Sequence, residues 1–266
     1  MRILWAYSKA NQPLTSAQHV LQSWARMTAA SSRQCGGPGG GTGGGGGRRN
    51  MSGGRSPLTV VLDLDECLVH SKFLETHETN PLHRDFRQPE WRPEHVKEVN
   101  AFECTLPWGE TVIVNKRPGL DHFLMECGDE FTTMCFTASD EVYANEVLDH
   151  LDPACHHISR RLFRDQCRKV KNTYLKDLSV LKRDLSRVVL VENSSKAVLA
   201  NPLNAILVPP FYDSPDDRAL EGVMELLHEL NEVDDVRPVL QEKLRLDKIL
   251  RAEIDLLFDT HGFQMT

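Results

Sequence analysis

The sequence predicts an α/β fold built on a Rossmann-like parallel sheet. Short, uninterrupted apolar segments such as Val60–Leu62 and Val188–Val191 have the composition of strands that are buried on both faces. Segments with a helical spacing of apolar residues alternate with these strands, as in chains that form a parallel sheet covered by helices. In such sheets functional side chains gather at the carboxyl ends of the strands, and polar residues follow several of the strands predicted here.

Length and composition are those of a soluble protein with one sizeable domain: 266 residues, 40% hydrophobic and 26% charged, with a formal net charge of −7. The charge is unevenly distributed. No Asp or Glu precedes Asp63, whereas seven Lys and Arg residues do, so the remainder carries 24 basic against 38 acidic side chains. This acidic balance excludes a basic surface that binds nucleic acid directly.

Residues 1–56 are expected to form a disordered tail with a glycine-rich linker, because ten of the twelve positions from 36 to 47 are glycine. The acid-free, Ser-containing start resembles a mitochondrial transit peptide. The alternatives are an untargeted tail or a start codon assigned too far upstream. The sequence contains no run of about 20 apolar residues, so no transmembrane helix is predicted. Seven cysteines without a C-x-x-C pair are typical of an intracellular protein. We expect a nuclear or cytoplasmic protein, with the mitochondrion as the minority alternative.

The folded domain is expected over residues 57–240. Its first strand is predicted at Leu58–Leu62, and the polar segment Lys72–Asn100 then forms a long insertion. Phe102–Leu106 and Thr111–Asn115 flank a Pro-Trp-Gly-Glu sequence and predict a β-hairpin.

The remaining elements of the domain alternate between helix and strand. A helix capped by Asp140 is predicted to end before Pro153. Two prolines stop the last predicted strand. In chain order we expect a helix at Leu120–Cys127, a strand at Phe131–Phe136, a helix at Asp140–Leu151, and strands at Val188–Val191 and Ala205–Val208.

Two helices are predicted at the end of the chain. Leu220–Leu230 has apolar residues at 223, 226, 227 and 230, which is the pattern of an amphipathic helix. Val239–Phe258 predicts a longer charged helix whose apolar side packs on the domain or on a partner. Residues 241–266 are therefore expected to form a helical extension of the domain.

Two aspartates at the end of the first predicted strand point to chemistry. Asp63 and Asp65 are two residues apart, so their side chains lean to the same side of an extended backbone. Carboxylates held this close raise each other's pKa unless a cation lies between them, and the cation that suits oxygen ligands best here is Mg²⁺. Asp63 can attack phosphorus as a nucleophile, and Asp65 can serve as general acid and base.

Further polar residues complete a phosphate site. The hydroxyl of Thr137, which follows a predicted strand, can hold a phosphate oxygen. The ammonium group of Lys176 can offset the charge on the phosphoryl oxygens. Asn193 supplies a neutral oxygen for the metal, and Glu192 supplies a further carboxylate beside it.

These residues lie in ordered motifs that resemble a known family. Asp63–Ser71 is similar to the first motif of the haloacid-dehalogenase superfamily, in the version found in FCP/SCP-type C-terminal-domain phosphatases. The later motifs match in order and spacing over roughly residues 57–240. They are Lys116–Gly119, Phe136–Ser139, Arg161–Arg164 ahead of a Tyr-x-Lys-Asp-Leu element, Val191–Ser194 and Val233–Val236.

The resemblance implies a haloacid-dehalogenase-type fold and a magnesium-dependent phosphoserine/phosphothreonine phosphatase that acts through an aspartyl phosphate. By it, Asp63 is the nucleophile, Asp65 the acid and base, and Thr137 and Lys176 bind phosphate. Asp63, the Asp65 backbone and Asn193 ligate Mg²⁺, with Glu192 nearby. Ser139 and Arg164 contact the substrate, and the hairpin belongs to a small inserted sheet that lines a peptide groove. The expected partner is a phosphoprotein, such as the RNA polymerase II tail, and the oligomeric state stays open.

Three features depart from the family pattern. Cys67 replaces the usual Thr, and its side chain is expected to point into the fold without much effect. Glu192 replaces the usual Asp beside the metal-binding Asn, and its extra methylene can shift the site and lower the rate. The long insertion Lys72–Asn100 is expected to reshape the substrate groove.

Two other functions are kept as alternatives. The same fold serves as a non-catalytic presequence receptor of the mitochondrial inner-membrane translocase, which the acid-free start and the acidic domain favour. That alternative is weakened because no membrane-spanning helix is predicted and because both aspartates, Thr137 and Lys176 are intact. The second alternative is a regulatory protein whose activity has been lost through Glu192.

Overall fold

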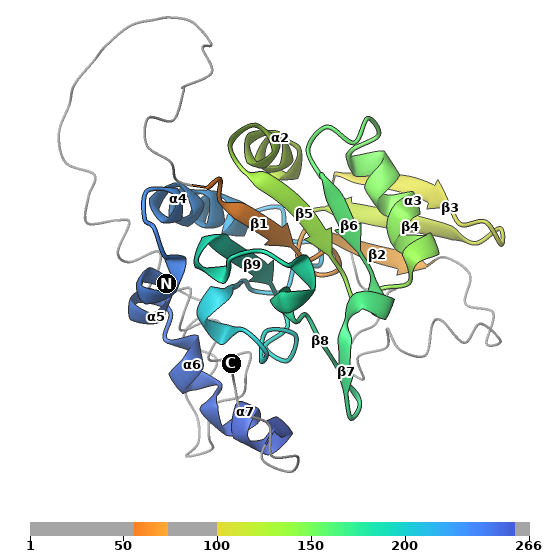
Figure 1. Ribbon diagram of the computed structural model, residues 1–266. Helices are drawn as coiled ribbons and strands as arrows, with labels where there is room; N and C mark the ends of the chain where they lie inside the picture. The colour runs from red at the N-terminus through yellow and green to blue at the C-terminus, as the bar shows by residue number, and fades with distance from the viewer. Residues whose placement is uncertain (1–55, 74–99, 259–266) are drawn as a thin grey trace, which may run out of the picture.

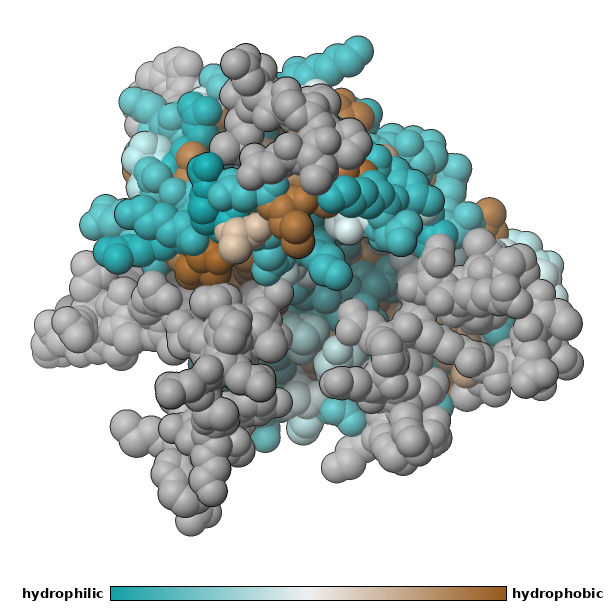
Figure 2. Space-filling model, turned by 90° about the horizontal axis from the view of Figure 1, so that it is seen from below, coloured by the Kyte–Doolittle hydropathy of each residue, from teal (hydrophilic) through white to brown (hydrophobic). Residues whose placement is uncertain are grey.

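The computed structural model describes residues 56–73 and 100–258. The predicted tail and glycine-rich linker, with the transit-peptide alternative, lie outside the described residues, as does most of the insertion. Within the described residues, no helix is both long and apolar enough to cross a membrane. The described part of the surface is mostly hydrophilic when seen from below, with apolar residues in a limited area (Figure 2).

The core is a five-stranded parallel sheet in the order β10-β9-β1-β5-β6 (Figure 1). Residues 60–62 of the central strand and residues 188–191 of its neighbour β9 are fully buried, which explains why both segments are continuously apolar. The strands are β1 (Thr59–Leu62), β5 (Thr132–Phe136), β6 (Arg160–Leu162), β9 (Val188–Glu192) and β10 (Ala205–Leu207). The expected parallel α/β fold is confirmed.

The register of the sheet places three strand ends at one level. Leu62 of β1 pairs with Cys135 of β5 on one side and with Val191 of β9 on the other. The residues that follow these strands therefore meet at the same edge of the sheet, because parallel strands share a direction. This edge holds Asp63, Thr137 and Glu192.

Helices pack around the sheet in the predicted places. Helix α2 (Leu120–Glu130) lies beside α4 (Ala219–Asn231) and against β5 (Figure 1). Helix α3 (Glu141–Leu151) starts after Asp140, whose side chain accepts a hydrogen bond from the Val142 N–H at 3.0 Å. Short 3₁₀ helices connect the remaining strands: η4 (Arg164–Gln166), η5 (Leu178–Leu181), η6 (Leu185–Arg187) and η7 (Pro202–Asn204).

The small sheet has three antiparallel strands rather than the two of the predicted hairpin. β4 (Thr111–Lys116) lies between β3 (Ala101–Thr105) and β2 (Val69–Phe73). Strand β2 carries the buried polar residues His70 and Ser71, so its sequence lacks the apolar pattern by which a strand is recognised. A further hairpin, which was not predicted, pairs β7 (Arg168–Val170) with β8 (Thr173–Leu175). Its strands are too short to show any periodicity in the sequence.

The prediction of one long helix over Val239–Phe258 is wrong. Three helices occur there: α5 (Val236–Lys243), α6 (Leu246–Ile249) and α7 (Arg251–Phe258). In one continuous helix Leu244 and Leu246 would point to nearly opposite sides. Both are buried, and the left-handed backbone of Arg245, with φ of 56°, changes direction between them so that each reaches the core. Burial of two leucines outweighs the cost of about 1–2 kcal/mol for that conformation.

Candidate active site

A tight loop presents the two aspartates. After Asp63 the chain turns through Glu66, whose φ is 54°, and returns as β2. The Leu64 carbonyl accepts hydrogen bonds from the N–H groups of Leu68 at 2.9 Å and Val69 at 3.1 Å. The side chain of Leu64 is fully buried, which leaves Asp63 and Asp65 on the other side of the loop, toward the cavity.

Arg117 holds this loop in place, a role that its position in a sequence motif did not indicate. Its side chain is fully buried and donates hydrogen bonds to the carbonyls of Cys67 and Pro209, both at 2.9 Å. It also forms a two-pronged ion pair with Asp217, at 2.7 and 2.9 Å. The guanidinium therefore joins the aspartate loop to the segments that follow β10 and precede α4.

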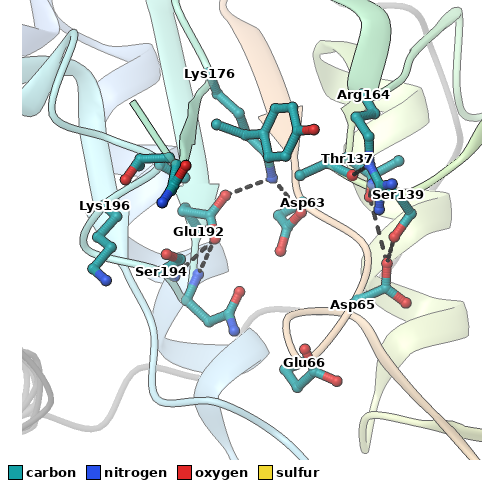
Figure 3. Close-up of a pocket in the computed structure, with 16 residues that line it drawn as sticks. Asp63, Asp65, Glu66, Thr137, Ser139, Arg164, Lys176, Glu192, Ser194 and Lys196 are labelled. Carbon is teal, nitrogen blue, oxygen red and sulfur yellow. Dashed lines mark hydrogen bonds and ion pairs between the residues drawn. The ribbon is translucent and has the colours of Figure 1, made fainter. Parts of the chain in front are cut away.

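Lys176 lies between two carboxylates. Its ammonium group contacts Asp63 Oδ1 and lies 2.5 Å from Glu192 Oε2 (Figure 3). All three side chains are almost completely buried. Burial lowers the pKa of Lys176, but the charges of Asp63 and Glu192 outweigh burial and raise that pKa overall, so the lysine stays protonated.

The pKa of Asp63 is raised, first by burial and then by the charge of Glu192, and the opposing effect of Lys176 does not cancel these two. Two carboxylates against one ammonium group leave an excess negative charge at this point of the site. The positive charge of a bound cation would offset both effects and lower the pKa of Asp63, so the local charge favours a metal ion here.

Asn193 adds a ligand of the expected kind. One end of its carboxamide lies 2.9 Å from Asp63 Oδ2 and 2.9 Å from Glu192 Oε1. If the NH₂ group lies at this end, the amide donates a hydrogen bond to each carboxylate. If the carbonyl lies there instead, its oxygen and the two carboxylate oxygens converge on one point. Ligands of Mg²⁺ at about 2.0–2.1 Å in octahedral geometry lie about 2.9 Å apart. The donor set and its spacing therefore fit Mg²⁺, and Asp63 and Asn193 are the residues that would hold it.

Glu192 uses both carboxylate oxygens. Oε2 contacts Lys176, and Oε1 accepts hydrogen bonds from the backbone N–H groups of Asn193 at 2.9 Å and Ser194 at 2.8 Å. The longer side chain at this position thus reaches the lysine and also holds the loop that carries Asn193.

Asp65 is held by three hydroxyl groups rather than by Lys176. Ser139 Oγ lies 2.5 Å and Thr137 Oγ1 3.4 Å from Asp65 Oδ2, and the Tyr143 hydroxyl lies 2.6 Å from Oδ1. The side chain of Asp65 is therefore turned to the opposite side of the cavity from Glu192 (Figure 3). Tyr143 was not predicted, because its position in α3 fits the pattern of an ordinary core residue.

Ser139 and Arg164 were expected to contact the substrate. Both line the cavity. The Ser139 hydroxyl is engaged with Asp65, and Arg164 Nε donates a hydrogen bond to the Ala138 carbonyl at 2.6 Å. The Arg164 guanidinium also lies over the ring of Tyr174, 5.6 Å from its centre. Arg164 is thus fixed at the rim, and its contact with substrate stays a prediction.

All the predicted site residues lie in one cavity of about 350 Å³ (Figure 3). It also contains residues that sequence analysis did not single out, among them Glu66, Tyr174 and Lys196. Cys67, the first departure from the family pattern, points into the fold as expected and is fully buried. A buried carboxylate beside a lysine, with a second carboxylate nearby and oxygen atoms that could hold a cation, is suited to phosphoryl transfer.

A comparison with known families matches residues 58–237 to the NLI interacting factor-like phosphatases. The chain belongs to this family. The predicted resemblance to FCP/SCP-type phosphatases is thereby confirmed. The site geometry described above therefore lies inside the family domain.

Curated relatives of this NLI interacting factor-like chain are named as phosphatases. A probable C-terminal domain small phosphatase of Dictyostelium discoideum is 43% identical over 184 residues, which cover 69% of this chain and 54% of the relative. CTD nuclear envelope phosphatase 1 of Xenopus tropicalis is 35% identical over 71% of this chain and 74% of its own length. The chain spans about half the length of the first of these. The solved structure of a fission yeast Fcp1 variant bound to beryllium fluoride is 20% identical, with a TM-score of 0.42. The alignment covers 79% of this chain and 68% of that chain.

Proposed function

We propose that this protein is a magnesium-dependent protein serine/threonine phosphatase that works through an aspartyl phosphate on Asp63. The observation that carries the proposal is the contact of buried Asp63 with Lys176, with Asp65 held on the opposite side of one cavity. Family membership supports a phosphatase, and the names of the relatives support a phosphoprotein as substrate.

In the first step a carboxylate oxygen of Asp63 attacks the phosphorus of a phosphoserine or phosphothreonine. The bond between phosphorus and the ester oxygen breaks, and Asp65 donates a proton to that oxygen as the alcohol leaves. Lys176, which stays charged between Asp63 and Glu192, and the hydroxyl of Thr137 stabilise the phosphoryl oxygens.

In the second step water attacks the phosphorus of the aspartyl phosphate. Asp65, now deprotonated, accepts a proton from that water, and inorganic phosphate leaves as the Asp63 carboxylate is restored. Mg²⁺, held by Asp63, Asn193 and the predicted Asp65 carbonyl, would neutralise charge on the transferred group. The three hydroxyls around Asp65 keep its carboxylate in one orientation through both steps.

Hydrolysis of p-nitrophenyl phosphate by the full chain tests this proposal. Turnover should require Mg²⁺, stop on addition of EDTA, and be absent from Asp63→Asn, which keeps the size of the side chain but is not a nucleophile. Acid quenching of the wild type during turnover should trap phosphate on the protein, and mass spectrometry should locate it on Asp63. Turnover that persists in Asp63→Asn would contradict the mechanism.

The two alternatives have less support. The family match gives none to a presequence receptor, and the mitochondrial location proposed with it is equally unsupported. Loss of activity through Glu192 is not favoured by its contacts, because the side chain holds Lys176 and the Asn193 loop together. The RNA polymerase II tail as substrate and a nuclear or cytoplasmic location stay predictions; a human relative is named for the polymerase tail.

A further inference from the structure

Basic side chains lie at the edge of the cavity, although the protein as a whole is acidic. Arg164 and Lys196 line it, and Lys169 lies over the ring of Tyr174, 5.3 Å from its centre. The formal net charge of the chain is −7. The mechanism uses Lys176 at the floor of the cavity, whereas it gives no role to Lys169 or Lys196.

Lys196 has a fixed place beside the reaction centre. It lies in a turn in which the Ala197 N–H donates to the Ser194 carbonyl at 3.2 Å. The Ala197 carbonyl in turn accepts a hydrogen bond from the backbone N–H of Lys176 at 2.9 Å. The turn that carries Lys196 is thus tied, through Ala197, to the backbone of the lysine that contacts Asp63.

The ammonium group of Lys196 has no acidic partner among residues 56–73 and 100–258. Its side chain is exposed, whereas Lys176 is buried and engaged with two carboxylates. An ordinary surface lysine of an acidic protein has many carboxylates within reach. Lys196 instead faces a cavity that a phosphorylated substrate must enter.

Lys196 and Arg164 lie on opposite sides of the Asp63–Lys176 contact (Figure 3). A phosphorylated residue that reaches Asp63 therefore has one cation on each side of it. The carboxylates of the cavity, including Asp65 and Glu192, repel an anionic substrate, and cations at the rim offset this repulsion.

We propose that this site selects phosphoserine or phosphothreonine in an acidic context, with Lys196 binding an acidic side chain that flanks the phosphorylated residue. The inference rests on the proposed function and specifies its class of substrate. The flanking group is a carboxylate of Asp or Glu or a second phosphorylated residue, since both present oxygens to an ammonium group. A single exposed ion pair of this kind changes affinity by about two- to fivefold.

The test uses the full chain and two phosphoserine peptides of equal length, one flanked on both sides by Glu and the other by Gln. The quantity compared is the ratio of kcat/KM for the Glu peptide to that for the Gln peptide. We expect the ratio to exceed one in the wild type, to fall about two- to fivefold in Lys196→Met through a higher KM, and to fall further in Lys196→Glu. Lys248→Met is the matched control, because Lys248 is exposed on α6 and does not line this cavity.

A third peptide with a second phosphoserine in place of the flanking Glu distinguishes the two sources of negative charge. If Lys196→Met lowers kcat/KM more for this peptide than for the Glu peptide, Lys196 binds a second phosphate. If the two losses are equal, Lys196 binds acidic groups of either kind. An unchanged ratio in both Lys196 variants, or an equal fall in Lys248→Met, would overturn the inference while leaving the phosphatase proposal intact.

Failure of the phosphatase proposal gives a different result. In that case neither peptide nor p-nitrophenyl phosphate is hydrolysed by the wild type. Fluorescence anisotropy then measures how tightly the labelled Glu peptide binds to the Asp63→Asn protein. This measurement tests the role of Lys196 in binding without requiring hydrolysis. Weaker binding after the further change Lys196→Met supports the acidic subsite, and equal binding contradicts it.

Discussion

The phenol oxygen of Tyr143 lies 2.6 Å from Asp65 Oδ1 and 2.6 Å from Ser71 Oγ. A hydroxyl has one proton, so Tyr143 donates to the carboxylate and accepts from Ser71. Burial and the charge of Asp65 raise the pKa of Tyr143, which keeps the phenol protonated and able to donate. Helix α3 thereby contributes a residue that orients the expected general acid.

Tyr143→Phe should lower kcat about tenfold and change KM little, because the ring still fills its place in the core while Asp65 loses one of its fixed hydrogen bonds. The measurement is steady-state hydrolysis of p-nitrophenyl phosphate, with the half-saturating Mg²⁺ concentration recorded in parallel. Tyr212→Phe is the control, since that hydroxyl does not contact Asp65. An unchanged kcat in Tyr143→Phe would show that Ser139 and Thr137 orient Asp65 without help.

Glu192→Gln should weaken Mg²⁺ binding and lower activity, each by about 10- to 100-fold. The substitution keeps the length of the side chain but removes one of the two negative charges around Lys176. Glu192→Asp is the matched variant, because it keeps the charge and restores the residue of the family pattern. We expect it to be impaired less than Glu192→Gln. Titration of activity with Mg²⁺ checks both, and equal losses in the two variants would mean that length matters more than charge.

Residues that follow buried strands could be predicted from the sequence. Asp63 and Thr137 end continuous apolar runs, and parallel pairing in register brings such ends together whatever the rest of the chain does. Lys176 follows the three-residue strand β8, which has no readable pattern, so its charge suggested a role but only the family motif supported its place at this edge of the sheet. Tyr143 gave no signal, since a hydroxyl that acts through a distant carboxylate looks like any buried tyrosine until the fold is known.

Strand β2 and the C-terminal helices are two of the elements that differ from the prediction, and in both the local sequence pattern conflicts with the fold. Strand β2 was missed because its polar side chains are buried by neighbours far away in the sequence; the Ser71 hydroxyl, for example, pairs with Tyr143. The three C-terminal helices were predicted as one helix because apolar residues recur with helical spacing on both sides of Arg245. The apolar face, however, points in a different direction after Arg245. Local periodicity shows that a segment is helical, but a change of phase within it depends on where the core lies.

Stability should decrease between pH 9 and pH 11 as buried thiols titrate. Burial, and to a smaller extent Glu146, raises the pKa of Cys104 from 9.0 to about 11. In that interval the unfolded chain loses the proton and the folded protein keeps it, so the folded state binds more protons and its stability falls as pH rises. Cys104→Val should reduce the fall in the free energy of unfolding by about 2 kcal/mol between these pH values. Urea unfolding at pH 8, 9, 10 and 11 measures it, and parallel curves for the two proteins would contradict the assignment.

Arg117→Met should be the most destabilising of these substitutions, by about 3–5 kcal/mol in the free energy of unfolding. Methionine keeps the volume but leaves Asp217 without its ion pair and the Cys67 and Pro209 carbonyls without a donor. Arg117→Lys retains the charge but cannot reach all three partners, so an intermediate loss is expected. Because Arg117 holds the aspartate loop, activity should fall even under conditions where both variants remain folded, as judged by circular dichroism. Full activity in folded Arg117→Met would mean that the loop keeps its shape through the Leu64 hydrogen bonds alone.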